Sequence, residues 1–183
     1  METLLNKKVS YYNPHKRESI HTFQRHLSYL LSTRNAKKKD VVIICIGSDR
    51  ATGDCLGPLV GDKLIKCNCP FYIYGTLEYP VHAKNLYQTM EYVRKKHADP
   101  FIIAIDASLG SSRHVGYVSI IQGALKPGIG VDKNLPDIGD ISITGIVNIS
   151  GMINHMLIQT TRLGLVMNLA DFISDGLSNA SSY

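Results

Sequence analysis

Two aspartates, Asp54 and Asp106, have the residue type and the positions to do chemistry together. Asp106 comes directly after the apolar run 101–105, and Asp54 lies in a glycine-rich segment that follows the apolar run 41–46. If both runs are parallel strands of one sheet, their carboxyl ends open on the same crevice, where open α/β sheets bind ligands. A converging pair of carboxyl groups can divide the roles of general acid and general base, because like charges in contact resist joint ionisation. The pair therefore predicts a hydrolase, with both aspartates catalytic.

Four further residues are candidates for binding the substrate of this hydrolase. Asp49 lies in the same loop as Asp54, where it either contacts substrate or stabilises the loop. His82 follows the next apolar run and could face the same crevice, where it would orient substrate or bind a metal, or it could cap the next helix. Lys126 and Gly128 belong to a segment described next, and we assign them to the same role.

The segment 123–140 is rich in glycine, proline and aspartate and is too long for a simple connection. Loops of this length inside a compact domain are usually functional or disordered. We expect a substrate-facing loop, with a mobile surface or a contact between copies of the chain as the alternatives.

Each catalytic candidate also has a purely structural interpretation. Asp54 could cap the following helix, and Asp106 could be a loop carboxylate bonded to nearby backbone amides. Cys55 could be a thiol nucleophile, but no motif links it to a histidine. The spacing of Gly47 and Gly53 matches no nucleotide-binding fingerprint, so we expect these glycines to allow tight or positive-φ backbone in the loop that presents Asp54.

The elements that must position these residues alternate between strand and helix. This order predicts a three-layer α/β/α sandwich with a mostly parallel sheet. We expect one domain over 1–183, with flexible ends at 1–15 and 178–183. The expected strands are 41–46, 71–76, 101–105, 116–122 and 141–149, and the expected helices are 16–34, 54–67, 83–97 and 152–173.

Composition narrows the class of protein. The chain has 183 residues, 44% of them hydrophobic, and needs neither disulfides nor a structural metal to hold a core. Its cysteines show no zinc pattern and fit a reducing cytoplasm, and we see neither a signal peptide nor a membrane-spanning run. The net charge is +5, but the chain lacks the basic motif with interleaved aromatic residues that is typical of RNA-binding modules, so we expect no direct nucleic-acid binding. A mildly basic surface is consistent with a protein or peptide partner. We expect no cofactor.

Three segments resemble a known family of proteases. Residues 46–58 resemble the segment of the bacterial spore germination protease that carries its first catalytic aspartate. Residues 103–107 resemble its Ile-Asp-Ala segment, and residues 126–131 its Pro-Gly loop. More closely, residues 20–177 resemble the YyaC group of sporulation proteins, which is related to that protease.

The resemblance implies a phosphorylase/hydrolase-like fold, which hydrogenase maturation proteases share. It implies that Asp54 and Asp106 are catalytic, and that the substrates are small acid-soluble spore proteins in the developing spore. In the maturation proteases a carboxylate pair and a histidine recognise nickel in the substrate, and His82 is the best placed counterpart. Gly53 replaces a proline of the protease and Cys55 an alanine, and the chain is much shorter. We therefore expect an endopeptidase of the sporulation type; the alternatives are a non-catalytic peptide-binding protein and a metal-dependent maturation-type peptidase.

Overall fold

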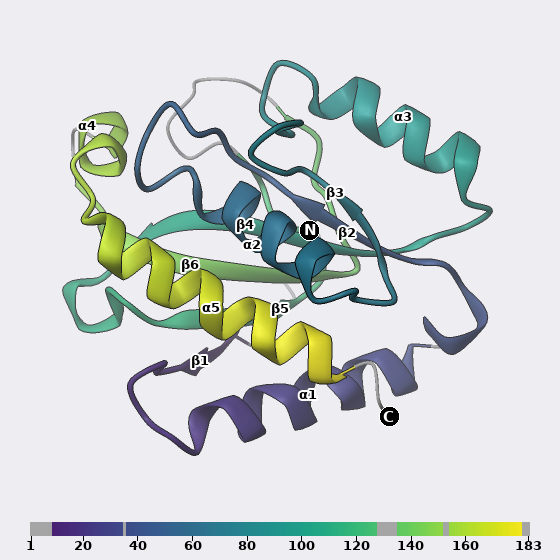
Figure 1. Ribbon diagram of the computed structural model, residues 1–183, viewed down its shortest axis with the longest axis horizontal. Coiled ribbons are helices and arrows are strands. Elements are labelled where there is room, and N and C mark those ends of the chain that lie inside the picture. Colours follow the sequence, from purple (N-terminus) through teal and green to yellow (C-terminus); the bar gives the residue numbers. More distant parts are fainter. Residues whose placement is uncertain (1–8, 35, 128–134, 152–153, 181–183) are drawn as a thin grey trace, which may run out of the picture.

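The computed structural model describes residues 9–34, 36–127, 135–151 and 154–180. Within these residues, six strands form one sheet in the order β1-β5-β6-β4-β2-β3, and five α-helices accompany it (Figure 1). The strands are β1 (Val9–Tyr12), β2 (Val41–Cys45), β3 (Tyr72–Tyr74), β4 (Phe101–Gly110), β5 (Val118–Gln122) and β6 (Ile141–Ile149). The helices are α1 (Ser19–Thr33), α2 (Leu56–Lys66), α3 (Leu86–Lys96), α4 (Asn154–Gln159) and α5 (Leu163–Ala180).

The sheet is mostly parallel, as the sequence predicted. Strands β3, β2, β4 and β6 pair in parallel, and β5 lies antiparallel between β6 and β1. Strands β2 and β4 are continuous apolar runs because both of their faces are buried, which is usual for central parallel strands.

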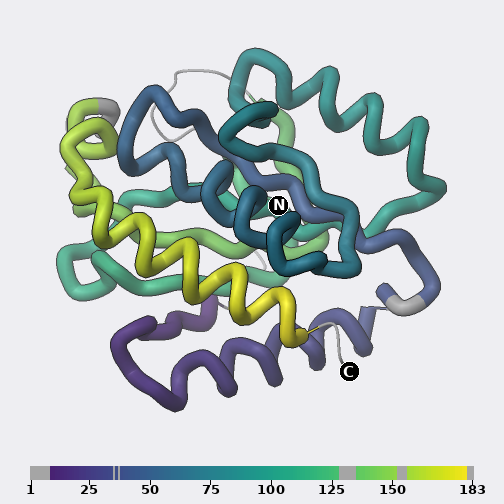
Figure 2. The backbone as a smooth tube through the Cα atoms, in the orientation of Figure 1, coloured from purple at the N-terminus to yellow at the C-terminus, as the bar shows by residue number. Residues whose placement is uncertain are grey.

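The two faces of the sheet are covered to different extents. On the covered face, α1, α2 and α5 bury one large apolar cluster; Figure 1 shows α2 and α5 lying over the strands and α1 alongside, near β1. Figure 2 shows α1 and α5, from opposite ends of the chain, running close together. On the opposite face, which we call the open face, a second cluster takes its helical residues from α3 alone within the described part of the chain. The chain is thus a three-layer α/β/α sandwich whose second helical layer is narrow.

Alternation along each strand decides which residues reach which face. In β4, Ile103, Ile105 and Ala107 belong to the apolar cluster of the covered face. The intervening Ala104 belongs to the cluster of the open face, which places Asp106 on that same face. The side chain of Asp106 is therefore directed away from the larger core.

Several expectations about element boundaries were wrong. The end expected to be flexible at 1–15 contributes β1, which pairs with β5, and α5 continues to Ala180 inside the end expected to be flexible at 178–183. Strand β4 continues to Gly110, so Asp106 lies within a strand and not at the start of a loop. Polar residues at 106 and 108 hid this extension, because they interrupt the apolar run while the alternate positions stay apolar. Among the described residues, no helix has the length and apolar character needed to cross a membrane.

Candidate active site

Three backbone segments meet where β2 ends, and hydrogen bonds hold them in place. The amide of Ile46 donates to the carbonyl of Ile105, 2.7 Å away, and the amide of Gly47 donates to the carbonyl of Val81, 2.8 Å away. Pairing between β2 and β4 stops at Cys45 and Ile105, whereas β4 continues beside β6. The residues that follow, Gly47, His82 and Asp106, therefore lie around the point where the pairing of β2 with β4 ends.

Asp54 lies beside these residues because the loop after β2 folds back on itself. The amide of Ser48 donates to the backbone carbonyl of Asp54 at 3.2 Å. Gly47 has φ +143°, and a Cβ there would collide with the carbonyl oxygen of Asp54, so glycine is required by the close approach. Gly53 has no positive φ; its amide donates to the carbonyl of Ile158 at 2.9 Å, and the backbones are too close for a side chain. The predicted role of the two glycines is thus confirmed, for different reasons.

Asp54 does not cap a helix, so that alternative was wrong. Helix α2 begins at Leu56, its N-cap is Cys55, and no side chain makes a capping hydrogen bond there. Asp106 is 6% exposed, and its Oδ1 accepts a hydrogen bond from the amide of Ala107 at 2.8 Å. The expected bond between Asp106 and a nearby backbone amide is therefore present, although the residue lies in a strand.

Hydrogen bonds hold the backbone of His82, and the residue lines the candidate site. Its amide donates to Oδ1 of Asn85 at 2.8 Å, and Nδ2 of Asn85 donates to the carbonyl of Pro80 at 2.9 Å. The N-cap of α3 is Asn85, so His82 is not the cap. Its Nδ1 is buried and has no hydrogen-bond partner among the described residues. An unpaired buried polar atom is costly, and a bound substrate group could supply the missing partner.

Asp54, Asp106 and His82 line one pocket of about 220 Å³. Burial raises the pKa of Asp54; the amide of Ser48 and the nearby His82 oppose that shift. A carboxyl group with a raised pKa holds its proton closer to neutral pH, as a general acid must. The thiol pKa of Cys55 is also raised by burial, and its Sγ lies 2.8 Å from the carbonyl of Thr52. This environment disfavours the thiolate that a cysteine nucleophile needs.

Of the predicted binding residues, only His82 lines this pocket within the described part of the chain. Asp49 is exposed and does not line the pocket, whereas its neighbour Arg50 does. Lys126 lines an adjoining groove, and Gly128 lies outside the described residues. Sequence reasoning missed Arg50 and the nearby Lys84, because exposed cations in loops carry no periodic or motif signal.

Two larger hollows adjoin the pocket through shared residues. The first, which we call the edge groove, measures about 910 Å³ and lies along β3 between α2 and α3; His82 lines both it and the pocket. The second, which we call the hydroxyl groove, measures about 660 Å³ and lies over β4, β6, β5 and β1; Asp106 lines both it and the pocket. Its floor carries a chain of hydroxyl groups in which Thr144 Oγ1 lies 3.3 Å from Ser108 and 2.8 Å from Ser119. An extended chain could therefore lie on both sides of the aspartates.

Within the described part of the chain, no three histidine, cysteine, aspartate or glutamate side chains are grouped to hold a metal ion. The candidate set for chemistry is therefore the two aspartates with His82 beside them.

The fold and the pocket define an α/β protein with a carboxylate-lined site at the carboxyl end of its parallel strands. The chain belongs to the family described as "Protein of unknown function (DUF1256)", which it matches over residues 10–176. It is 51% identical over 148 residues to the uncharacterized protein YyaC of Bacillus subtilis (strain 168), covering 80% of this chain and 72% of that protein. The resemblance to the YyaC group is thus confirmed.

A solved structure is also similar to this chain. It is the [NiFe] hydrogenase maturation protease HycI from Thermococcus kodakarensis KOD1, at 17% identity and a TM-score of 0.44, covering 83% of this chain and 98% of that one.

Proposed function

We propose that this protein is an endopeptidase in which Asp54 and Asp106 act as a pair. The observation that carries the proposal is that both carboxyl groups line one pocket of about 220 Å³, although they come from segments far apart in the sequence. Two carboxyl groups in contact favour a state with one shared proton, because joint ionisation is costly. One aspartate, as carboxylate, takes a proton from the attacking water while the other donates its proton to the peptide carbonyl oxygen. The first aspartate then gives its proton to the leaving amine, and the second takes a proton back as the tetrahedral intermediate collapses.

The surroundings of the pocket favour a polypeptide substrate over a small molecule. The edge groove and the hydroxyl groove meet the pocket at His82 and Asp106, so a chain lying in both would cross the aspartates. The edge groove runs beside β3, which is the last strand of the sheet and has an unpaired edge within the described part of the chain. Extended peptides bind such edges through backbone hydrogen bonds.

We take the candidate substrate from the resemblance to the germination protease. Small acid-soluble spore proteins are the first substrates to test, and the site of action is then the cytoplasm of the developing spore. His82 would orient the substrate through its unpaired Nδ1.

The test is cleavage of a purified small acid-soluble spore protein, followed by mass spectrometry of the products. The parent and Asp175→Asn, a control at an exposed aspartate of α5 outside the pocket, are expected to cleave at the same bonds and at similar rates. Asp54→Asn and Asp106→Asn are each expected to lose about 10²–10⁴-fold in rate, which is the usual contribution of a general acid or base. Circular dichroism spectra like the parent's would show that the variants fold.

Cleavage at parental rates by both asparagine variants would overturn the proposal. Binding without cleavage by the parent would favour a non-catalytic peptide-binding protein. Activity that a chelator removes, that a divalent metal restores and that His82→Ala abolishes would favour the metal-dependent alternative.

A further inference from the structure

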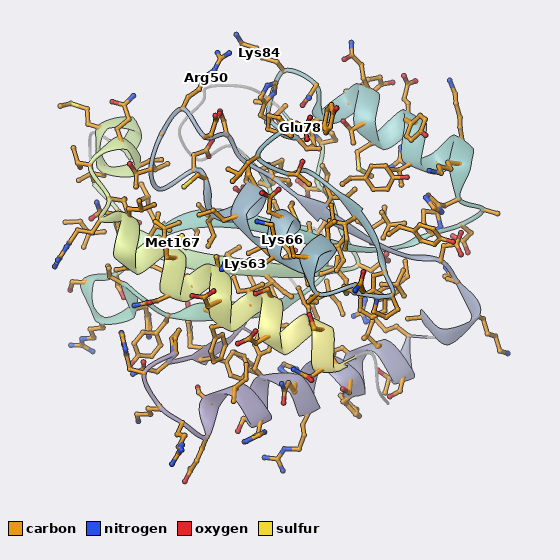
Figure 3. The ribbon with its side chains drawn as sticks, in the orientation of Figure 1. Arg50, Lys63, Lys66, Glu78, Lys84 and Met167 are labelled. Atoms are coloured by element: carbon orange, nitrogen blue, oxygen red, sulfur yellow. The ribbon has the colours of Figure 1, made fainter. Side chains whose placement is uncertain are left out.

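Two positively charged side chains stand at the mouth of the candidate active site. Arg50 comes from the loop between β2 and α2, and Lys84 from the segment that precedes α3. Both are exposed, and both line the pocket that contains Asp54 and Asp106. Figure 3 shows the two side chains at the same edge of the molecule, directed outward. The pocket therefore has acidic groups inside and basic groups at its rim.

The fold does not use these two charges. Within the described residues, Arg50 and Lys84 have no carboxylate at ion-pair distance, and the ion pairs that do form lie elsewhere. One example is Lys63, whose Nζ pairs with Asp171 on the covered face. The rim cations are thus available to a ligand.

The chemistry of this pair suits a carboxylate. An arginine guanidinium binds a carboxylate through two parallel hydrogen bonds, and a lysine ammonium adds a point charge beside it. An acidic substrate is otherwise repelled by a pocket that contains two aspartates, and cations at the rim offset that repulsion.

We propose that Arg50 and Lys84 bind a carboxylate of the substrate and so place the neighbouring peptide bond over Asp54 and Asp106. The inference rests on the proposed function for the choice of a polypeptide substrate, and it makes acidic segments the preferred ones. The carboxylate is either an aspartate or glutamate side chain or the carboxyl terminus of the substrate chain.

The test measures binding, so that its outcome does not depend on cleavage. Isotope-labelled protein is titrated with the peptide acetyl-Ala-Ala-Glu-Ala-Ala-Ala-amide and with its twin that carries glutamine in place of glutamate, while backbone amide signals are followed by NMR. The glutamate peptide is expected to move the signals of Ser48, Arg50 and Lys84 and to bind at least about fivefold more tightly than its twin, as one or two exposed ion pairs allow. The glutamine peptide with a free carboxyl terminus shows whether the terminal carboxylate binds in the same place.

A matched pair of variants separates local contact from overall charge. Arg50→Gln with Lys84→Gln is expected to remove the preference for the glutamate peptide. Arg94→Gln with Lys95→Gln, which removes the same charge from exposed positions of α3, is expected to keep it. Equal binding of the two amidated peptides and the free-carboxyl peptide by the parent would overturn the inference, as would equal losses in the rim and control variants. Neither result would decide whether Asp54 and Asp106 cleave peptides, which the asparagine variants test separately.

Discussion

The covered face and the open face of the sheet are built from alternate residues of the same strands, yet they differ in content. On the covered face, β4 contributes Ile105 and Ala107 to an apolar cluster that three helices close. On the open face the same strand contributes Asp106 and Ser108, which line the pocket and the hydroxyl groove. The comparison shows that both faces bury apolar side chains, while the open face also keeps polar groups of β4 beside the pocket.

The largest expected effect is on the covered face. Phe23 is fully buried and contacts Tyr12 and Phe172 edge-on, with ring centroids 5.2 and 5.3 Å apart. Phe23→Ala is expected to lower the free energy of unfolding by about 3–5 kcal/mol, because removal of a large buried ring leaves a cavity. Urea denaturation measures this change. Ser119→Ala on the open face serves as the comparison, and a loss as large there would erase the distinction between the faces.

A smaller effect on stability is expected in the loop between β2 and α2. Gly47→Ala forces a side chain onto φ +143° and against the carbonyl of Asp54. We expect a loss of about 1–3 kcal/mol in the free energy of unfolding, the usual range for backbone strain, together with loss of cleavage because Asp54 is displaced. Gly164→Ala is a control, since a Cβ there meets no atom within 4 Å. Unchanged stability and cleavage in Gly47→Ala would show that the loop does not hold Asp54 as described.

The dependence of stability on pH sharpens the comparison further. The pKa of Asp54 is raised in the folded protein above its ordinary value of 3.8, so the folded state binds more protons than the unfolded state in that window. The contribution of Asp54 to stability is therefore fully present at pH values below its pKa in the unfolded chain. This contribution is lost as the pH rises through the pKa of Asp54 in the folded protein. Asp54→Asn is therefore expected to be more stable than the parent near neutral pH, with the difference shrinking at acidic pH. Thermal unfolding across a pH series measures it, and a neutral-pH destabilisation in Asp54→Asn would contradict the raised pKa.

The smallest effect on stability is expected in the edge groove. Tyr79 lines that groove and is 73% exposed, so Tyr79→Ala should change the free energy of unfolding by no more than about 0.5 kcal/mol. It should nevertheless raise KM for a protein substrate, because an exposed aromatic ring in a groove offers contact area to a bound chain. Tyr29, which is 62% exposed and outside the groove, gives the control Tyr29→Ala. Equal KM values for the two variants would exclude the groove from substrate binding.

The sequence predicted the covered face better than the open one, for physical reasons. Buried β-branched runs identified β2 and the first half of β4, because burial on both faces requires apolar residues at every position. Strand β1 was missed, since four residues of mixed polarity at an edge give little periodic signal. The sequence singled out Asp54 and Asp106 because each follows such a run. Their position around one pocket depends on where the pairing between β2 and β4 ends, which no local sequence pattern indicates.

The most direct test of the central claim is an NMR titration of the carboxyl carbons of Asp54 and Asp106. If the two groups share one pocket and one proton, they titrate as a coupled pair, and replacing one removes a neighbouring negative charge from the other. We predict that the pKa of Asp54 lies above 3.8 in the parent and falls in Asp106→Asn. An Asp54 titration that is the same in the parent and in Asp106→Asn would show that the carboxyl groups act independently and would contradict the paired mechanism.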